Sequence, residues 1–100
     1  MEVNQLCISG AVAEVKKARS TPAGVPISSF VMTHRSQQME ANQPRVVECE
    51  IQVQLTGQQF DEVRAQLSSG QQVEVTGALS KLSHKQPKAL KILASQVLLR

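Results

Sequence analysis

Hydrophobic and polar residues alternate most regularly between residues 47 and 55. Val47, Cys49, Ile51, Val53 and Leu55 fall on one parity, and acidic or amide side chains fill the positions between them. A period of two is typical of a β-strand with one face buried and the other in water. The pattern therefore predicts a strand here, with Cys49 as a small buried hydrophobe on its core face.

Four further segments have the composition of strands. They are, in chain order, residues 3–15, 27–35, 72–80 and 90–99. Gly10 interrupts the first of these, as a bend or bulge does, so we expect a kink there. Polar or proline-containing segments separate the strands, and we expect loops over residues 16–26, 36–44 and 81–89.

One segment changes to a helical period. Phe60, Val63 and Leu67 follow one another at spacings of three and four residues. Thr56 is the expected N-terminal cap, and Gly70 is the expected end of the segment. The pattern therefore predicts a short helix between the third and fourth strands.

The resulting order is strand, strand, strand, helix, strand, strand within 100 residues. A chain of this length predicts one domain, covering residues 1–100. The order is that of the OB fold, an all-β, five-stranded barrel with a short helix between strands three and four. An open five-stranded sheet fits the same order, but closure removes the exposed edges and is therefore favoured.

Positive charge is concentrated in two segments. The net charge is +3, yet no acid follows Glu74, whereas five Lys or Arg residues do, and a second basic group lies at residues 16–19. Localised positive charge fits a polyanionic partner, and the alternative is a solvated basic surface. In an OB barrel the ligand is held by the loops after the first and fourth strands. These loops, 16–26 and 81–89, carry the charge, so we expect nucleic-acid binding.

Other chemistry is not indicated. The sequence has no metal-binding or phosphate-binding motif, its two cysteines form no disulfide framework, and neither histidine lies near a cysteine in sequence. Glu48 and Glu50 share one strand face, which is more typical of solvation than of acid–base catalysis. We therefore expect no enzymatic activity, no cofactor and no metal. Without a membrane-spanning apolar run or a signal peptide, a cytoplasmic protein is expected.

Short motifs spread over the chain carry a family resemblance. They are residues 21–26 (Thr-Pro-Ala-Gly-Val-Pro), 30–32, 34–36 (His-Arg-Ser), 75–77 and 94–97, together with Cys49 and Gly57. Together they resemble primosomal replication protein N (PriB), a family of bacterial relatives of single-stranded DNA-binding protein. The resemblance implies a homodimer of OB barrels that binds single-stranded DNA. It also implies action with the PriA helicase and other primosome proteins to restart stalled replication forks.

The resemblance also implies a set of DNA contacts. The lysine-bearing loop of the family matches Lys81, Lys85 and Lys88, which we expect to be the principal contact. The position at which the family has a DNA-binding aromatic residue carries Glu48, and the chain has no Trp or Tyr. Base stacking is therefore reduced, and charge should dominate binding. The expected DNA-binding residues are Lys16, Lys17, Arg19, Arg35, Arg45, Lys81, Lys85, Lys88 and Lys91.

Two functions remain open at this point. The first is a single-stranded DNA-binding accessory protein of the replication-restart primosome. The second is a protein-interaction adaptor with weak or incidental nucleic-acid binding, which the missing aromatic residues favour. Both fit a homodimer, because residues 6–8 and 90–99 are apolar on both parities. The affinity for single-stranded DNA at two salt concentrations distinguishes the two functions.

Overall fold

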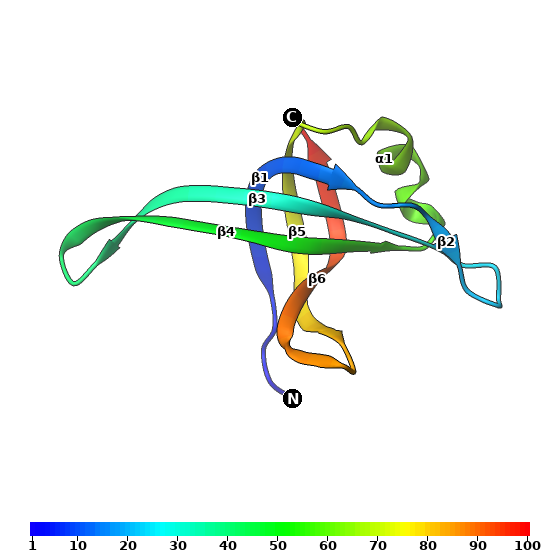
Figure 1. Ribbon diagram of the computed structural model, residues 1–100, viewed down its shortest axis with the longest axis horizontal. Coiled ribbons are helices and arrows are strands. Elements are labelled where there is room, and N and C mark those ends of the chain that lie inside the picture. Colours follow the sequence, from blue (N-terminus) through cyan, green and yellow to red (C-terminus); the bar gives the residue numbers. More distant parts are fainter.

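The computed structural model describes residues 1–100 and consists mainly of strands (Figure 1). Its elements are β1 (Leu6–Val15), β2 (Arg19–Ser20), β3 (Pro26–Glu40), β4 (Gln43–Thr56), η1 (Gln58–Phe60), α1 (Asp61–Gln66), β5 (Gln72–Ser83) and β6 (Gln86–Leu99). The sheet order β1–β5–β6–β4–β3–β2, with an added β1–β3 pairing, closes the five long strands into a barrel. This confirms the all-β OB barrel with a short helix between its third and fourth long strands. The two-residue β2 lies within a segment expected to be a loop.

β1 closes one side of the barrel by changing partners. It pairs antiparallel with β5 over residues 6–11 and with β3 over residues 11–15. Gly10 lies just before this change, and a Cβ atom there would collide with the carbonyl oxygen of Thr33. Glycine therefore permits the close approach of β1 to β3. The irregularity expected at Gly10 lies slightly further along, where the register with β3 shifts between Val12 and Glu14.

The first strand begins at Leu6 rather than at Val3. The preceding segment still runs along β5, because the side-chain amide of Asn4 makes the two hydrogen bonds that a backbone partner would otherwise make. Asn4 Nδ2 donates to the carbonyl oxygen of Leu79 at 2.8 Å, and the Leu79 N–H donates to Asn4 Oδ1 at 2.9 Å. These two bonds cover part of the edge that β5 would otherwise expose.

The core lies inside the barrel and follows the predicted parities. Its buried side chains are Val12, Phe30, Met32, Val53, Leu55, Phe60, Val73, Val75, Ile92 and Val97. Val53 and Leu55 confirm the core face of the most regular strand, and Val63 and Leu67 pack against the core from the helical segment. Each fully buried side chain of this size stabilises the fold by roughly 1.5–3 kcal/mol.

Two hairpins extend beyond the barrel, and both correct the sequence-based prediction (Figure 1). Residues 36–44 are not a loop: β3 and β4 stay paired up to Glu40 and Gln43, around a turn of Ala41 (φ 51°) and Asn42 (φ 63°). Residues 81–89 are also mostly strand, because β5 continues to Ser83 and β6 begins at Gln86. The strands continue beyond the end of the barrel. In these extensions, residues of alternating polarity are mostly exposed on both faces of each hairpin.

Cys49 shows this effect. It has the core parity of β4, but it is exposed, because it lies beyond the barrel on the β3–β4 hairpin. The prediction of a buried cysteine was therefore wrong. Cys7, which faces away from the partly buried Leu6 and Ile8, is exposed as well.

The helical segment begins differently from the expectation. Thr56 is the last residue of β4 and caps no helix, while Gly57, with φ 106°, turns the chain into η1. α1 ends at Gln66, so Gly70 (φ 88°) lies in the following turn. No helix in the structure combines the length and apolar composition needed to span a bilayer.

Arg64 fastens α1 to the barrel. Its Nε donates to Ser28 Oγ at 2.6 Å, and its Nη2 donates to the carbonyl oxygens of Leu55 (3.0 Å) and Pro26 (3.2 Å). Its Nη1 also pairs with Asp61. Only 14% of the side chain is exposed, so this cation is structural and does not add to the basic surface.

Candidate nucleic-acid interface

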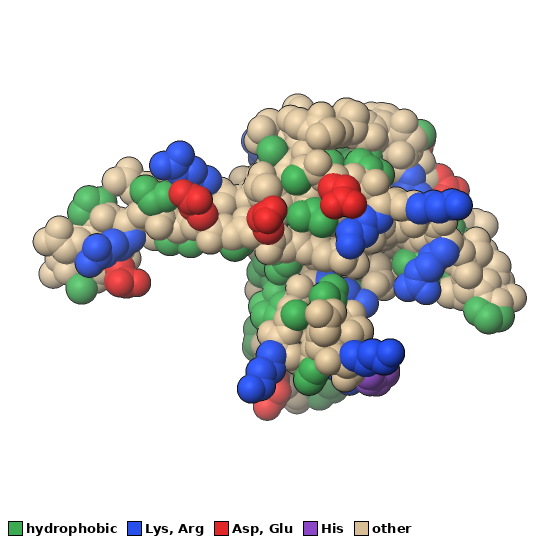
Figure 2. Space-filling model, in the orientation of Figure 1, with side chains coloured by type: hydrophobic (Ala, Val, Ile, Leu, Met, Phe, Trp, Pro, Cys, Tyr) green, Lys and Arg blue, Asp and Glu red, His purple; other side chains and the backbone are tan.

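The β5–β6 hairpin gathers the three lysines expected to be the main contact. Lys81, Lys85 and Lys88 are all exposed near its turn. Lys81 Nζ lies 3.0 Å from His84 Nδ1, while Lys85 and Lys88 have no ion-pair or hydrogen-bond partner. Figure 2 shows basic side chains at this lower end of the molecule. The hairpin thus presents mobile positive charge, which suits phosphate contacts.

A second basic group lies on the connection between β1 and β3. Lys16, Lys17 and Arg19 are exposed there, without a paired acid. The connection contains a tight turn, since the Gly24 N–H donates to the carbonyl oxygen of Thr21 at 2.8 Å. This group lies near β2, at the right of Figure 2, apart from the β5–β6 hairpin.

Lys91 belongs to the barrel wall. It lies opposite Gln52, where β6 runs parallel to β4, and is half-buried. Its Nζ donates to Gln54 Oε1 at 2.8 Å. Lys91 is therefore held in place between the two strands, unlike the lysines of the hairpin.

The two arginines of the β3–β4 hairpin do not act together. Arg35 lies directly opposite Glu48, and its Nε is 3.5 Å from Glu48 Oε1. Arg45 lies opposite Gln38. Side chains alternate between the two faces of a strand, so Arg45 lies on the face opposite to that of Glu48. Only Arg45 is without a paired acid.

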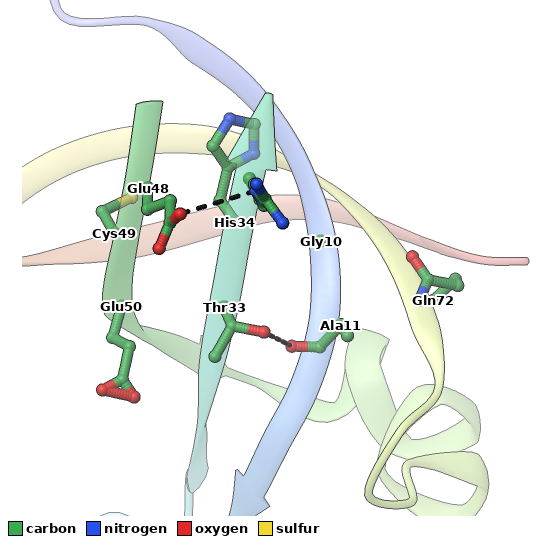
Figure 3. Close-up of a pocket in the computed structure, with 9 residues that line it drawn as sticks. Gly10, Ala11, Thr33, His34, Glu48, Cys49, Glu50 and Gln72 are labelled. Atoms are coloured by element: carbon green, nitrogen blue, oxygen red, sulfur yellow. Dashed lines mark hydrogen bonds and ion pairs between the residues drawn. The ribbon is translucent and has the colours of Figure 1, made fainter. Parts of the chain in front are cut away.

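A shallow pocket lies at the root of this hairpin, between β1, β3 and β4 (Figure 3). His34 organises it. The Ser9 carbonyl oxygen can only accept, so His34 Nδ1 donates to it at 2.6 Å, and His34 Nε2 lies 2.8 Å from Ser36 Oγ. Gln38 Nε2 donates to the same hydroxyl oxygen at 2.9 Å. The bond to Ser9 ties the hairpin to β1, and the other two contacts link side chains along β3.

The acids of the pocket are not arranged as a catalytic pair. Glu48 interacts with an arginine, while Glu50 points away from it in Figure 3. No group of three or more His, Cys, Asp or Glu side chains forms a potential metal site. The pocket is thus a polar recess of the barrel surface.

Arg100 is another cation that does not add to the basic surface. Its Nη2 lies 2.9 Å from Glu74 Oε2. This hydrogen bond and the positive charge of Arg100 hold the pKa of Glu74 below its usual value. The positive electrostatic potential of the region after Glu74 therefore comes from its lysines.

The sequence reasoning missed the partners of three candidate cations. They are Glu48 for Arg35, His84 for Lys81 and Gln54 for Lys91. The first and third contacts cross between strands, so they follow only from the register of the sheet. The structure places the nine candidates in separate groups and does not bring them into one patch.

Comparisons with known proteins fit this architecture. A family model described as "another single-strand binding protein family" matches residues 4–94. Replication restart protein PriB of Shewanella sediminis is 38% identical over 80 residues, which cover 80% of this chain and 78% of that protein. The chain belongs to the PriB family. The resemblance identified from the sequence motifs is therefore confirmed. PriB of Haemophilus ducreyi is 40% identical over 74 residues, and the match spans only 60% of its length.

Solved structures agree with the fold. PriB from Ralstonia solanacearum superimposes with a TM-score of 0.84 at 29% identity, covering 99% of each chain. The small single-stranded DNA-binding protein from Streptomyces coelicolor gives a TM-score of 0.77 at 18% identity, covering 100% of this chain and 95% of that chain. The second likeness concerns the fold alone. The barrel described above is thus shared with the Ralstonia PriB and with the Streptomyces single-stranded DNA-binding protein.

Proposed function

We propose that this protein binds single-stranded DNA as a non-enzymatic accessory protein of replication restart in the bacterial cytoplasm. Family membership supports the role. One structural observation carries it: the β5–β6 hairpin presents Lys81, Lys85 and Lys88, and no acid pairs with any of them. In OB barrels this connection holds the nucleic acid. By extension from the family, the protein acts with the PriA helicase and other primosome proteins.

Charge should dominate the interaction. Without Trp or Tyr, the protein lacks the roughly 1–3 kcal/mol per base that aromatic stacking supplies. Lysines bind phosphates without reading the bases, so the affinity should be similar for all sequences. The second group, at residues 16–19, and Lys91 offer further phosphate contacts on the barrel.

We also propose that the protein is a homodimer. Residues 6–10 of β1 pair only with β5, so the other edge of this segment lacks a neighbouring strand. The exposed Leu93 and Leu98 of β6 add apolar surface. The Ser9 carbonyl oxygen on this edge already accepts from His34. A second copy paired along β1 would satisfy the backbone groups that remain open and cover apolar area.

Titration of a fluorescent oligothymidine at about 50 mM and about 200 mM NaCl tests DNA binding. Anisotropy should show a clear loss of affinity at the higher salt, with a slope near −0.7 per phosphate contact in a plot of log K against log salt. A duplex of equal length is the control. Binding that is absent at about 50 mM salt, or that hardly changes with salt, would contradict the proposal.

A protein-interaction adaptor is the second candidate function. The observation that favours it is the Arg35–Glu48 ion pair, because it places a carboxylate on the strands that OB-fold ligands cross. Such a protein would bind its partner helicase at both salt concentrations used above and show no DNA binding of its own. Pull-down with the purified helicase, with and without the oligothymidine, distinguishes the two functions.

A further inference from the structure

The Arg35–Glu48 pair lies on the outward face of the β3–β4 hairpin. The two residues are directly opposite in the strand register, with 3.5 Å between Arg35 Nε and Glu48 Oε1. Their side chains are 73% and 65% exposed. An ion pair this exposed adds little to stability. The main effect of the pair is therefore on the charge of this surface.

The carboxylate of Glu48 already neutralises the charge of Arg35 within the protein. Arg35 is the one candidate DNA contact that forms an ion pair with an acid. A phosphate that approaches Arg35 must displace the carboxylate and then remain close to it. Two like charges about 4 Å apart in water repel by an energy that corresponds to about fivefold in a binding constant.

The same face carries a second acid. Glu50 follows Glu48 on the outward parity of β4, opposite Thr33, and no cation pairs with it. Gln52 and Gln54 continue this parity with neutral side chains. The β4 face thus has negative and neutral groups along the stretch between Arg35 and Lys91.

We infer that Glu48 is a negative determinant of the DNA path. It neutralises Arg35 and, together with Glu50, keeps the single strand off the β3–β4 face. Phosphate contacts are thereby confined to the β5–β6 hairpin and the other unpaired cations. This inference rests on the proposed binding of single-stranded DNA, and it specifies which surface the strand avoids.

The test is a set of charge-matched variants in the full chain. Glu48→Gln removes the carboxylate and keeps a similar shape, and Glu62→Gln removes the same charge from the exposed surface of α1. Oligothymidine should bind Glu48→Gln about fivefold more tightly than Glu62→Gln, with a salt slope steeper by about 0.7, because Arg35 becomes available to a phosphate. Arg35→Gln should change the affinity by less than about twofold in the wild type, yet abolish the gain in the Glu48→Gln background.

The outcomes separate this inference from the proposed function. If the wild type binds with the expected salt dependence, but Glu48→Gln and Glu62→Gln behave alike, the inference is wrong and the function stands. The inference is also wrong if Arg35→Gln weakens the wild type as much as Lys85→Gln does. If the wild type and every variant fail to bind, both are wrong. Melting curves of the variants should overlay, because the pair is exposed.

Discussion

The imidazole of His34 donates a hydrogen bond from Nδ1 to the carbonyl oxygen of Ser9, over 2.6 Å. This bond joins β3 to β1 at the point where the barrel ends and the β3–β4 hairpin begins. Beyond it the two strands of the hairpin pair only with each other. A two-stranded ribbon is marginally stable alone. The His34–Ser9 bond therefore holds the root of a weakly supported element.

Replacing His34 with alanine should destabilise the protein measurably. The change removes the bonds to Ser9 and Ser36, which in a half-exposed setting are together worth about 1 kcal/mol. For a domain of this size, Tm should fall by roughly 4–8 °C. Gln37→Ala, on the exposed neighbouring position, is the control and should leave Tm unchanged. A His34→Ala protein that melts with the wild type would show that the hairpin needs no anchor.

Removing the three lysines of the β5–β6 hairpin should weaken DNA binding for every sequence alike. A Lys81→Ala, Lys85→Ala, Lys88→Ala variant should lose about 2 from the magnitude of the salt slope, because each phosphate contact contributes about 0.7. Anisotropy at two salt concentrations measures this. The matched control is Lys16→Ala, Lys17→Ala, Arg19→Ala, which removes the same charge from the other basic group. If only the control weakens binding, the contact lies on residues 16–19.

Glu48→Trp should tighten DNA binding beyond the effect of removing the charge. The indole would add a stacking surface, worth roughly 1–3 kcal/mol, at the position where the resemblance implies an aromatic residue. Comparison with Glu48→Gln isolates this part, because both variants lack the carboxylate. The expected difference is at least about fivefold in Kd for oligothymidine. Equal affinities of the two variants would show that no base reaches this position.

A charge on the open segment of β1 should dissociate the proposed dimer. Cys7 is exposed on this segment, and Cys7→Lys would place a lysine from each copy in one apolar interface. The dissociation constant should rise by about tenfold or more. Sedimentation of micromolar protein measures it, with Glu62→Lys on α1 as the control. A wild type that sediments as a monomer would remove the basis of this prediction.

Arg64→Ala should be the most destabilising of these substitutions. It leaves the buried Ser28 hydroxyl and the carbonyl oxygens of Leu55 and Pro26 without their donor. The loss should be about 3 kcal/mol, measured by urea unfolding. Arg64→Lys should recover only part, since one ammonium group cannot reproduce the guanidinium geometry. A fully stable alanine variant would mean that water replaces all three bonds.

The barrel could be predicted from sequence because its strands bury one face. Phe30 and Met32 share a parity and are both fully buried, as expected. The prediction failed where strands leave the barrel. Residues 36–44 are polar on both faces, so they resemble a loop, and an alanine at positive φ is not a recognisable turn signal. The Arg35–Glu48 contact could not be predicted either, because it depends on the register of that hairpin.

The parallel pairing of β4 with β6 has a consequence for how the chain folds. It consists of the three residue pairs that join Gln52–Gln54 to Lys91–Leu93. The β3–β4 hairpin can form as soon as its own residues have left the ribosome, but the barrel stays open until residues 91–93 emerge. Until then the side chains that will contact Ile92 face solvent. We therefore expect slow closure, dominated by contacts between distant parts of the sequence, and a need for protection of the nascent chain.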